Sequence, residues 1–167
     1  MSYPDPVKEK LRYIYEDLIW LANRPHITPR QARAWYSQVL ATTMVRQVRV
    51  FTGYVSLAAI DDVHQKLVLE HYNRLSFELS LLIEHHINNQ INAPEEFIKL
   101  IDKCERVHIT TDEENHKAKK EQGNYEAAGI QLHYWNSIET DKRRILWERK
   151  LKGKVSNSSN YSPNNNL

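Results

Sequence analysis

The chain has 167 residues with 41% hydrophobic residues, enough for one domain with its own core, and its formal net charge of +2 is too small to imply a polyanionic partner by itself. Its single cysteine excludes an internal disulfide, argues against a thiolate zinc site and fits a reducing cytoplasm. No apolar run is long enough to cross a bilayer and the N-terminus lacks the features of a secretion signal, so we expect a cytoplasmic protein with no membrane partner.

The first third of the chain has a helical period. Apolar residues recur every three or four positions after Pro6, which predicts an amphipathic helix that Arg24-Pro25 ends. Thr28 followed by Pro29 predicts the N-cap and first turn of a second helix. We expect this helix to fade between Arg49 and Gly53, so that residues 1–55 form a helical N-terminal part.

The middle of the chain mixes strands and helices. A strand is expected over Lys66–Glu70 and a helix over Leu75–Ile87. Asn92-Ala93-Pro94 opens a short helix that ends near Cys104, and Arg106–Thr110 is predicted to be a second strand.

The next helix has the clearest start signal in the sequence. Thr110 with Glu113, or Thr111 with Glu114, fits a capping box, in which each residue satisfies a backbone amide near the other. We expect this helix to end at Gly123-Asn124.

The last third contains a short strand, a basic helix and a polar tail. Alternation over Ile130–Tyr134 predicts the strand, and the helix is expected from about Asp141 to Leu151. Residues 156–167 are rich in Ser and Asn and have little to bury, which predicts a disordered tail. We expect residues 1–155 to form a single domain, with the central core at 66–120 and the last strand and helix within 121–154.

Three side chains are candidates for chemistry. Glu70 and His71 end the first predicted strand, and Asn115 lies in the second turn of the capped helix. A carboxylate, an imidazole that titrates near neutral pH and an amide oxygen are what a single-metal phosphodiesterase needs. The pattern therefore favours a nuclease.

These segments resemble the HNH, or ββα-metal, endonucleases, particularly the HNH domain of RNA-guided CRISPR effector nucleases. Glu70-His71 takes the place of the family's Asp-His and Ser76 that of its Ser, while Ile109-Thr110 matches the Leu-Thr step and Asn115 follows at the family's distance. Arg74 stands where the family has Pro. The resemblance covers about residues 66–120, with a helical insertion between the strands.

The resemblance implies a fold and a mechanism. The fold would be α+β and mostly helical, with the N-terminal helices packed on the ββα-metal core. His71 would be the catalytic base, and Glu70 and Asn115 would hold one Mg²⁺ or Mn²⁺. The substrate would be double-stranded DNA, and cutting both strands with one site per chain favours a homodimer.

Basic side chains offer a surface for the DNA backbone. They lie on the capped helix and on the basic C-terminal helix: Lys117, Lys119, Arg143, Arg144, Arg149 and Lys150. Because a nuclease must hold DNA in register, we expect these residues to contact phosphates. The alternative is a non-catalytic helical module that binds nucleic acid or protein through the same helix.

Other histidines are weaker candidates. His85 and His86 are adjacent, so they point in different directions on a helix, and we expect rim positions with His86 partly buried. His108 alternates with Ile109 on a strand, which favours a structural role, although it could also face the site.

Overall fold

A computed structural model describes residues 3–73 and 75–163. Arg74, which stands at the family's Pro position, lies outside the described residues, as do residues 164–167 at the end of the expected tail. The fold is α+β and mostly helical, as predicted. Contacts divide the chain into two compact units: the described residues of 1–48 and 74–105, and those of 49–73 and 106–167.

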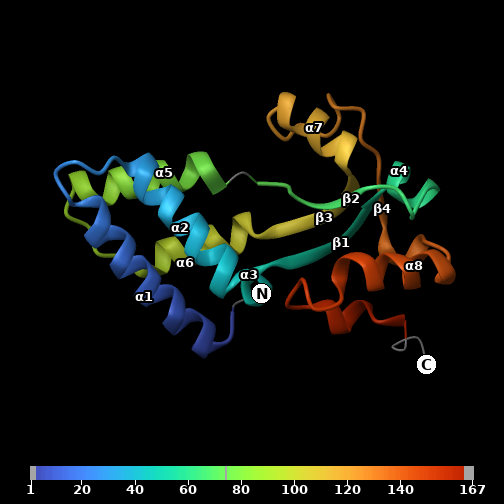
Figure 1. Ribbon diagram of the computed structural model, residues 1–167, viewed down its shortest axis with the longest axis horizontal. Helices are drawn as coiled ribbons and strands as arrows, with labels where there is room; N and C mark the ends of the chain where they lie inside the picture. Colours follow the sequence, from blue (N-terminus) through green and yellow to red (C-terminus); the bar gives the residue numbers. More distant parts are fainter. Residues whose placement is uncertain (1–2, 74, 164–167) are drawn as a thin grey trace. The chain divides into compact units, whose positions relative to one another are not determined.

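The first unit is helical (Figure 1). Its helices are α1 (Asp5–Ala22), α2 (Pro29–Thr43), α3 (Val45–Val48), α5 (Leu75–Asn88) and α6 (Pro94–Cys104). Thr28 and Gln31 form a capping box that starts α2, as the Thr-Pro signal indicated. Buried side chains of α1, α2, α5 and α6 share one core, so the expected insertion between the two strands packs with the N-terminal helices.

The second unit contains a four-stranded sheet in the order β2-β3-β1-β4. The strands are β1 (Val50–Ser56), β2 (Leu67–His71), β3 (Arg106–Thr111) and β4 (Leu132–Tyr134). The helical elements are α4 (Leu57–Asp61), α7 (Asp112–Lys120), η1 (Trp135–Ser137), α8 (Thr140–Leu146), the π-helical turn η2 (Trp147–Leu151) and η3 (Ser158–Tyr161). Strand β1 runs parallel to β3, whereas β2–β3 and β1–β4 are antiparallel pairs.

Strand β1 corrects the expectation that residues 1–55 form a helical N-terminal part. Residues 50–56 alternate between the two faces of the sheet, a period of two that the preceding helical pattern obscured. The pairing with β3 shifts between Phe51 and Val55, and Gly53 in this interval has φ +88°. Gly53 therefore provides a bulge that a residue with a side chain would strain.

The sheet has two faces of different chemistry, with α7 on one side and α8 on the other (Figure 1). The α8 face carries the larger apolar cluster of the unit, which includes Phe51, Val55, Leu67, Val107, Ile109, Leu146 and Leu151. By strand alternation the α7 face carries Thr52, Tyr54, Ser56, Val68, Glu70, His108, Thr110, Leu132 and Tyr134.

The expectation of a disordered tail is wrong for residues 156–163, which the structure places against the sheet. Asn157 accepts a hydrogen bond from the Phe51 backbone amide at 2.9 Å and donates to the Phe51 carbonyl oxygen at 2.8 Å. The ring of Tyr161 lies 4.7 Å from that of Phe51 and 5.7 Å from that of Trp135. Long-range side-chain contacts therefore fix this segment, which its polar composition did not indicate.

No helix in residues 3–73 and 75–163 combines the length and the apolar character that a membrane span requires.

Candidate functional site

Strands β2 and β3 and helix α7 form a ββα unit. The strands pair in antiparallel register from Leu67 opposite Thr111 to His71 opposite Val107. Helix α7 follows β3 directly, because Thr111 caps it: the Thr111 hydroxyl accepts from the Glu114 amide at 3.1 Å. Of the two capping boxes that the sequence allowed, Thr111 with Glu114 is the one that forms.

Helix α7 lies over one face of the sheet. The Ser56 hydroxyl on β1 donates to the Glu114 carboxylate at 2.5 Å, which ties the first turn of α7 to the middle of the sheet. Ala118, one turn further along, is buried in a small cluster with Tyr125 and Ile130. The segment after α7 thus returns over the same face.

Glu70 is buried on this face beneath Tyr125. Its side chain is 5% exposed, and the Tyr125 hydroxyl donates a hydrogen bond to its carboxylate. Burial raises the pKa of Tyr125, and the hydrogen bond to Glu70 raises it further, so the phenol stays protonated and remains a donor. The carboxylate is therefore fixed in place by a residue that is 55 positions away in the sequence.

His108 lies directly opposite Glu70 on the neighbouring strand and on the same face. Its Nδ1 is 2.5 Å from the Thr52 hydroxyl oxygen. Because the Thr52 hydroxyl donates to the Val107 carbonyl oxygen, we assign Nδ1 as the donor to Thr52. Burial lowers the pKa of His108 to about 4, so the ring is neutral at pH 7.

Two more oxygen-bearing side chains belong to this region. The Thr110 hydroxyl is buried and has no hydrogen-bond partner within the described residues. Asn115 is half-buried and lies three positions before Ala118, on the sheet-facing side of α7. Glu70, Thr110 and Asn115 together offer a carboxylate, a hydroxyl and an amide oxygen, the ligand types that Mg²⁺ accepts beside bound water. The structure groups no three His, Cys, Asp or Glu side chains for a metal ion within 3–73 and 75–163.

His71 lies on the other face of the sheet. Its neighbour Tyr72 contacts the Tyr125 ring at 5.8 Å, so residues 70 and 72 share the α7 face and His71 between them points to the α8 face. Strand β2 is at the edge of the sheet, and His71 is its last residue. Glu70 and the sheet-facing side of α7, which carries Asn115, are therefore on the α7 face. His71, at the end of β2, is on the α8 face.

Two of the predicted DNA contacts are directed into the protein. Arg149 donates to the backbone carbonyl oxygens of Val63 and Gln65, and Lys150 donates to that of Leu67. Burial lowers the pKa of Lys150. Both side chains therefore fasten η2 to the chain entering β2, a role that the basic composition of the helix did not reveal.

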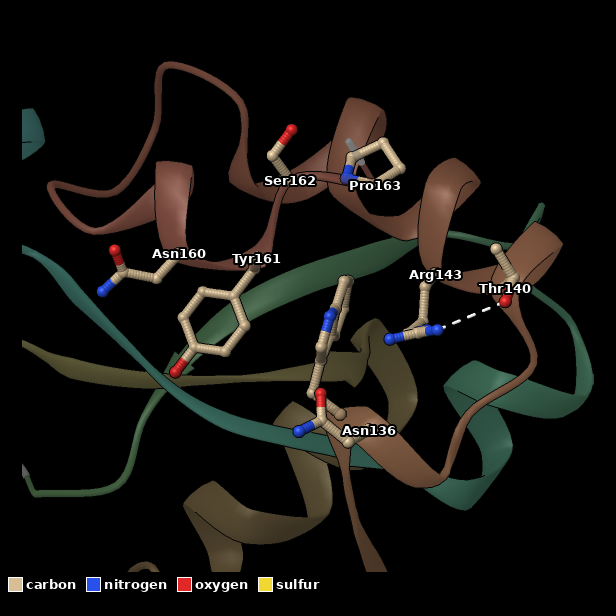
Figure 2. Close-up of a pocket in the computed structure, with 8 residues that line it drawn as sticks. Asn136, Thr140, Arg143, Asn160, Tyr161, Ser162 and Pro163 are labelled. Carbon is tan, nitrogen blue, oxygen red and sulfur yellow. Dashed lines mark hydrogen bonds between the residues drawn. The ribbon is translucent and has the colours of Figure 1, made fainter. Parts of the chain in front are cut away.

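The other predicted cations are on the surface or at its rim. Arg143 donates to the Thr140 hydroxyl at 3.2 Å and lines a hollow of about 20 Å³ opposite Tyr161, room for roughly one water molecule (Figure 2). Arg144 pairs with Asp141 at 3.3 Å. On α7, Lys117 pairs with Glu113 at 2.9 Å and Lys119 is exposed. Arg144, Lys117 and Lys119 thus fit the predicted phosphate contacts better than Arg149 and Lys150.

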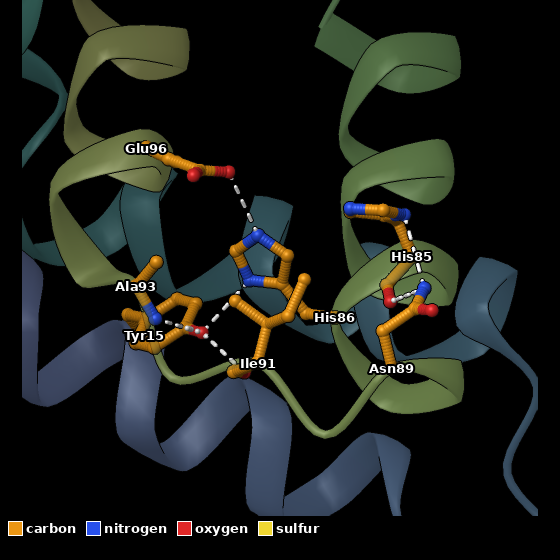
Figure 3. Close-up of polar contacts among 7 residues, drawn as sticks. All are labelled: Tyr15, His85, His86, Asn89, Ile91, Ala93 and Glu96. Carbon is orange, nitrogen blue, oxygen red and sulfur yellow. Dashed lines mark hydrogen bonds and ion pairs between the residues drawn. The ribbon is translucent and has the colours of Figure 1, made fainter.

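The helical unit has a polar network of its own around His86, which is fully buried rather than at the rim (Figure 3). Glu96 lies 3.1 Å from Nε2, and the Tyr15 hydroxyl lies 2.8 Å from Nδ1. Since a carboxylate only accepts, Nε2 donates to Glu96, and the Tyr15 hydroxyl hydrogen can be directed either to Nδ1 or to the Ile91 carbonyl oxygen 3.3 Å away. The Ala93 amide donates to the Tyr15 oxygen at 3.1 Å, so this network is internally satisfied and fits a structural role.

Sequence reasoning missed the aromatic residues of the α7 face. Tyr54, Tyr72 and Tyr125 surround His108, with ring centroids 5.5–5.8 Å from it. The one available signal was the alternation of residues 50–56, which places Tyr54 opposite the apolar positions. Tyr125 comes from a loop, and nothing local to it indicates its partner.

Comparisons with protein-family models, with curated proteins and with solved structures each found no match to this chain.

Proposed function

We propose that the second unit hydrolyses phosphodiester bonds of DNA at the corner of its sheet where β2 ends. The observation that carries the proposal is the ββα arrangement: an antiparallel pair, β2–β3, leads directly into α7, and a buried carboxylate lies on the face that α7 covers. A buried carboxylate at the end of an edge strand costs stability, and functional sites are where such costs are retained.

The α7 face supplies oxygen ligands for a Mg²⁺ or Mn²⁺ ion. Glu70 and Asn115 would hold it, together with the Thr110 hydroxyl, which suits this role because it has no hydrogen-bond partner within residues 3–73 and 75–163. A bound ion would stabilise the negative charge that builds on the phosphate and on the leaving oxygen.

The chain's own residues position the substrate and handle the proton. Tyr125 holds Glu70 by its hydroxyl, so the carboxylate is oriented before substrate arrives. His71, the last residue of the edge strand, would act as the base, which requires its imidazole to reach past the end of β2 to a phosphate held on the Glu70 side. Lys117 and Lys119 contact the backbone beside the cut.

Cleavage of supercoiled plasmid by purified protein in Mg²⁺ or Mn²⁺ tests the proposal. We expect excess chelator to abolish cutting and Mn²⁺ to restore it. Glu70→Gln keeps the shape but removes the charge, and it should lower the cleavage rate by at least about 100-fold. Asn115→Ala and His71→Ala should each lower it by about 100-fold or more.

Matched controls separate chemistry from folding. His85→Ala changes an exposed histidine of the helical unit and should cut like wild type. Thermal melting of His71→Ala should match wild type. Undiminished cutting in chelator, or by Glu70→Gln, would overturn the proposal, and DNA binding without any cutting by wild type would favour the non-catalytic module instead.

A further inference from the structure

Four rings form a row across the α7 face, in the same order as the strands that carry them. Tyr72, just after β2, lies 5.7 Å from His108 on β3. His108 lies 5.8 Å from Tyr54 on β1, and Tyr54 lies 5.7 Å from Tyr134 on β4. Strands β3, β1 and β4 and the residue after β2 thus each contribute one ring to an aromatic row whose neighbouring rings meet edge to face.

The tyrosines of the row are open to solvent, although aromatic rings on a sheet are commonly core residues. Tyr54 is 41% exposed, Tyr134 51% and Tyr72 52%. Helix α7 covers another part of this face, since its contacts go to Ser56 and to the cluster around Ala118. Tyr54 and Tyr134 are neighbouring exposed rings, and Tyr72 is separated from them by His108, which is only 6% exposed. Exposed aromatic rings on one face of a sheet are an apolar surface that a domain retains for a partner.

Charged groups of both signs border the row. The carboxylates of Glu70 and Glu114 on this face both accept hydrogen bonds from protein groups. Arg106 is exposed on β3, two positions before His108 and therefore on the same face. A partner that lies along the rings thus meets a cation at their border.

We propose that the aromatic row binds an unpaired nucleic-acid strand by base stacking, with Arg106 near its phosphates. Paired bases in a duplex are stacked on one another and cannot lie on a flat sheet, whereas bases of a single strand stack readily on exposed aromatic rings. Four strands spaced by about 4.8 Å give a row roughly 14 Å long, room for two or three bases. The row begins beside Glu70, so it leads to the hydrolytic corner.

This inference rests on the proposed function in one respect, that the bound single strand is also a substrate. The substrate class is then DNA with an unpaired segment next to the bond that is cut. Binding and cutting are separated by working in chelator, where no hydrolysis is expected. If the protein binds the single strand but cuts no DNA when Mg²⁺ or Mn²⁺ is added, the proposed function fails and the binding proposal survives. If it does not bind the single strand but cuts duplex DNA, the binding proposal fails and the proposed function survives.

Fluorescence anisotropy of a labelled dT15 strand, titrated with the full chain in chelator, tests the row. We expect wild type to bind dT15 at least about tenfold more tightly than a 15-base-pair duplex. Tyr54→Leu keeps an apolar side chain but removes the ring, and it should weaken dT15 binding by roughly 5- to 100-fold. Tyr54→Phe keeps the ring and should bind within about twofold of wild type.

Tyr13→Leu removes an equally exposed tyrosine from the helical unit and should leave binding unchanged. If Tyr54→Leu melts early, Tyr134→Leu on the edge strand β4 replaces it as the test. The proposal is overturned if the leucine variants bind dT15 like wild type, if Phe and Leu at position 54 behave alike, or if duplex binds as tightly as dT15.

Discussion

The two faces of the sheet are built on the same four strands but differ in what they bury: one buries apolar side chains and the other buries polar ones. The α8 face is closed by apolar side chains that are almost fully buried, and Arg149 and Lys150 fasten its rim. The α7 face buries Glu70, His108 and Thr110, each of which costs more to bury than an apolar residue. The α8 face therefore accounts for stability, whereas the α7 face retains polar groups that stability alone would not select.

The largest effect should come from the pH dependence of stability through His108. Its pKa is about 4 in the folded chain and about 6.5 when unfolded, so between these values only the unfolded chain binds the proton. The free energy of unfolding should therefore fall by about 3 kcal/mol as pH falls from about 6.5 to about 4. Urea melts of wild type and His108→Asn across this range measure it, and the difference between them cancels carboxylate titration. If the free energy of unfolding changes equally with pH in the two proteins, His108 is not the cause of the change.

On the α8 face, Arg149→Ala should lower the free energy of unfolding by about 2 to 3 kcal/mol, because two carbonyl oxygens lose a charged donor. Arg144→Ala is the matched control, since its exposed pair with Asp141 contributes little, within about 0.5 kcal/mol. Urea melts decide between them. If Arg149→Ala is as stable as wild type but binds DNA more weakly, Arg149 contacts DNA phosphates and has no structural role.

On the α7 face, Tyr125→Phe should lower the free energy of unfolding by about 1 to 3 kcal/mol, because Glu70 stays buried with one donor fewer. Tyr13→Phe loses only an exposed hydrogen bond to Glu9 and should change stability by less than about 0.5 kcal/mol. If chemical melts show both variants alike, the Tyr125 hydroxyl does not hold Glu70.

The smallest expected change in stability is that of Thr110→Val, and it distinguishes a functional from a structural role of the Thr110 hydroxyl. Thr110→Val removes a buried hydroxyl that has no partner in the described chain, so in chelator the variant should be as stable as wild type or about 1 kcal/mol more stable. Adding Mn²⁺ should raise the melting temperature of wild type more than that of the variant. A marked loss of stability in chelator would mean that the hydroxyl has a structural partner.

The parts of the fold that local signals specify could be predicted from sequence. The β2 and β3 strands and the cap of α7 follow from apolar runs and from Thr111 with Glu114, which act within a few residues of one another. Strand β1 was missed because its period of two directly follows a helical pattern, and its partner β3 lies more than 50 positions away.

The candidate site depended on contacts that no local pattern specifies. Glu70 lies on the face that α7 covers, but the alternation of β2 sends His71 to the other face, a consequence of the strand period that the Glu70-His71 dipeptide by itself does not show. Tyr125 reaches Glu70 from a loop, and Arg149 turns inward to donate to the carbonyl oxygens of Val63 and Gln65. Such pairings are decided by tertiary packing.

The most direct test of a metal site on the α7 face is Mn²⁺ titration of ¹⁵N-labelled protein, followed by line broadening of backbone amides. We expect selective broadening of the amides of Glu70, Thr110 and Asn115 at substoichiometric Mn²⁺, and we expect this broadening to be lost in Glu70→Gln. Broadening centred on His86 and Glu96 in the helical unit, or none that Glu70→Gln removes, would contradict it.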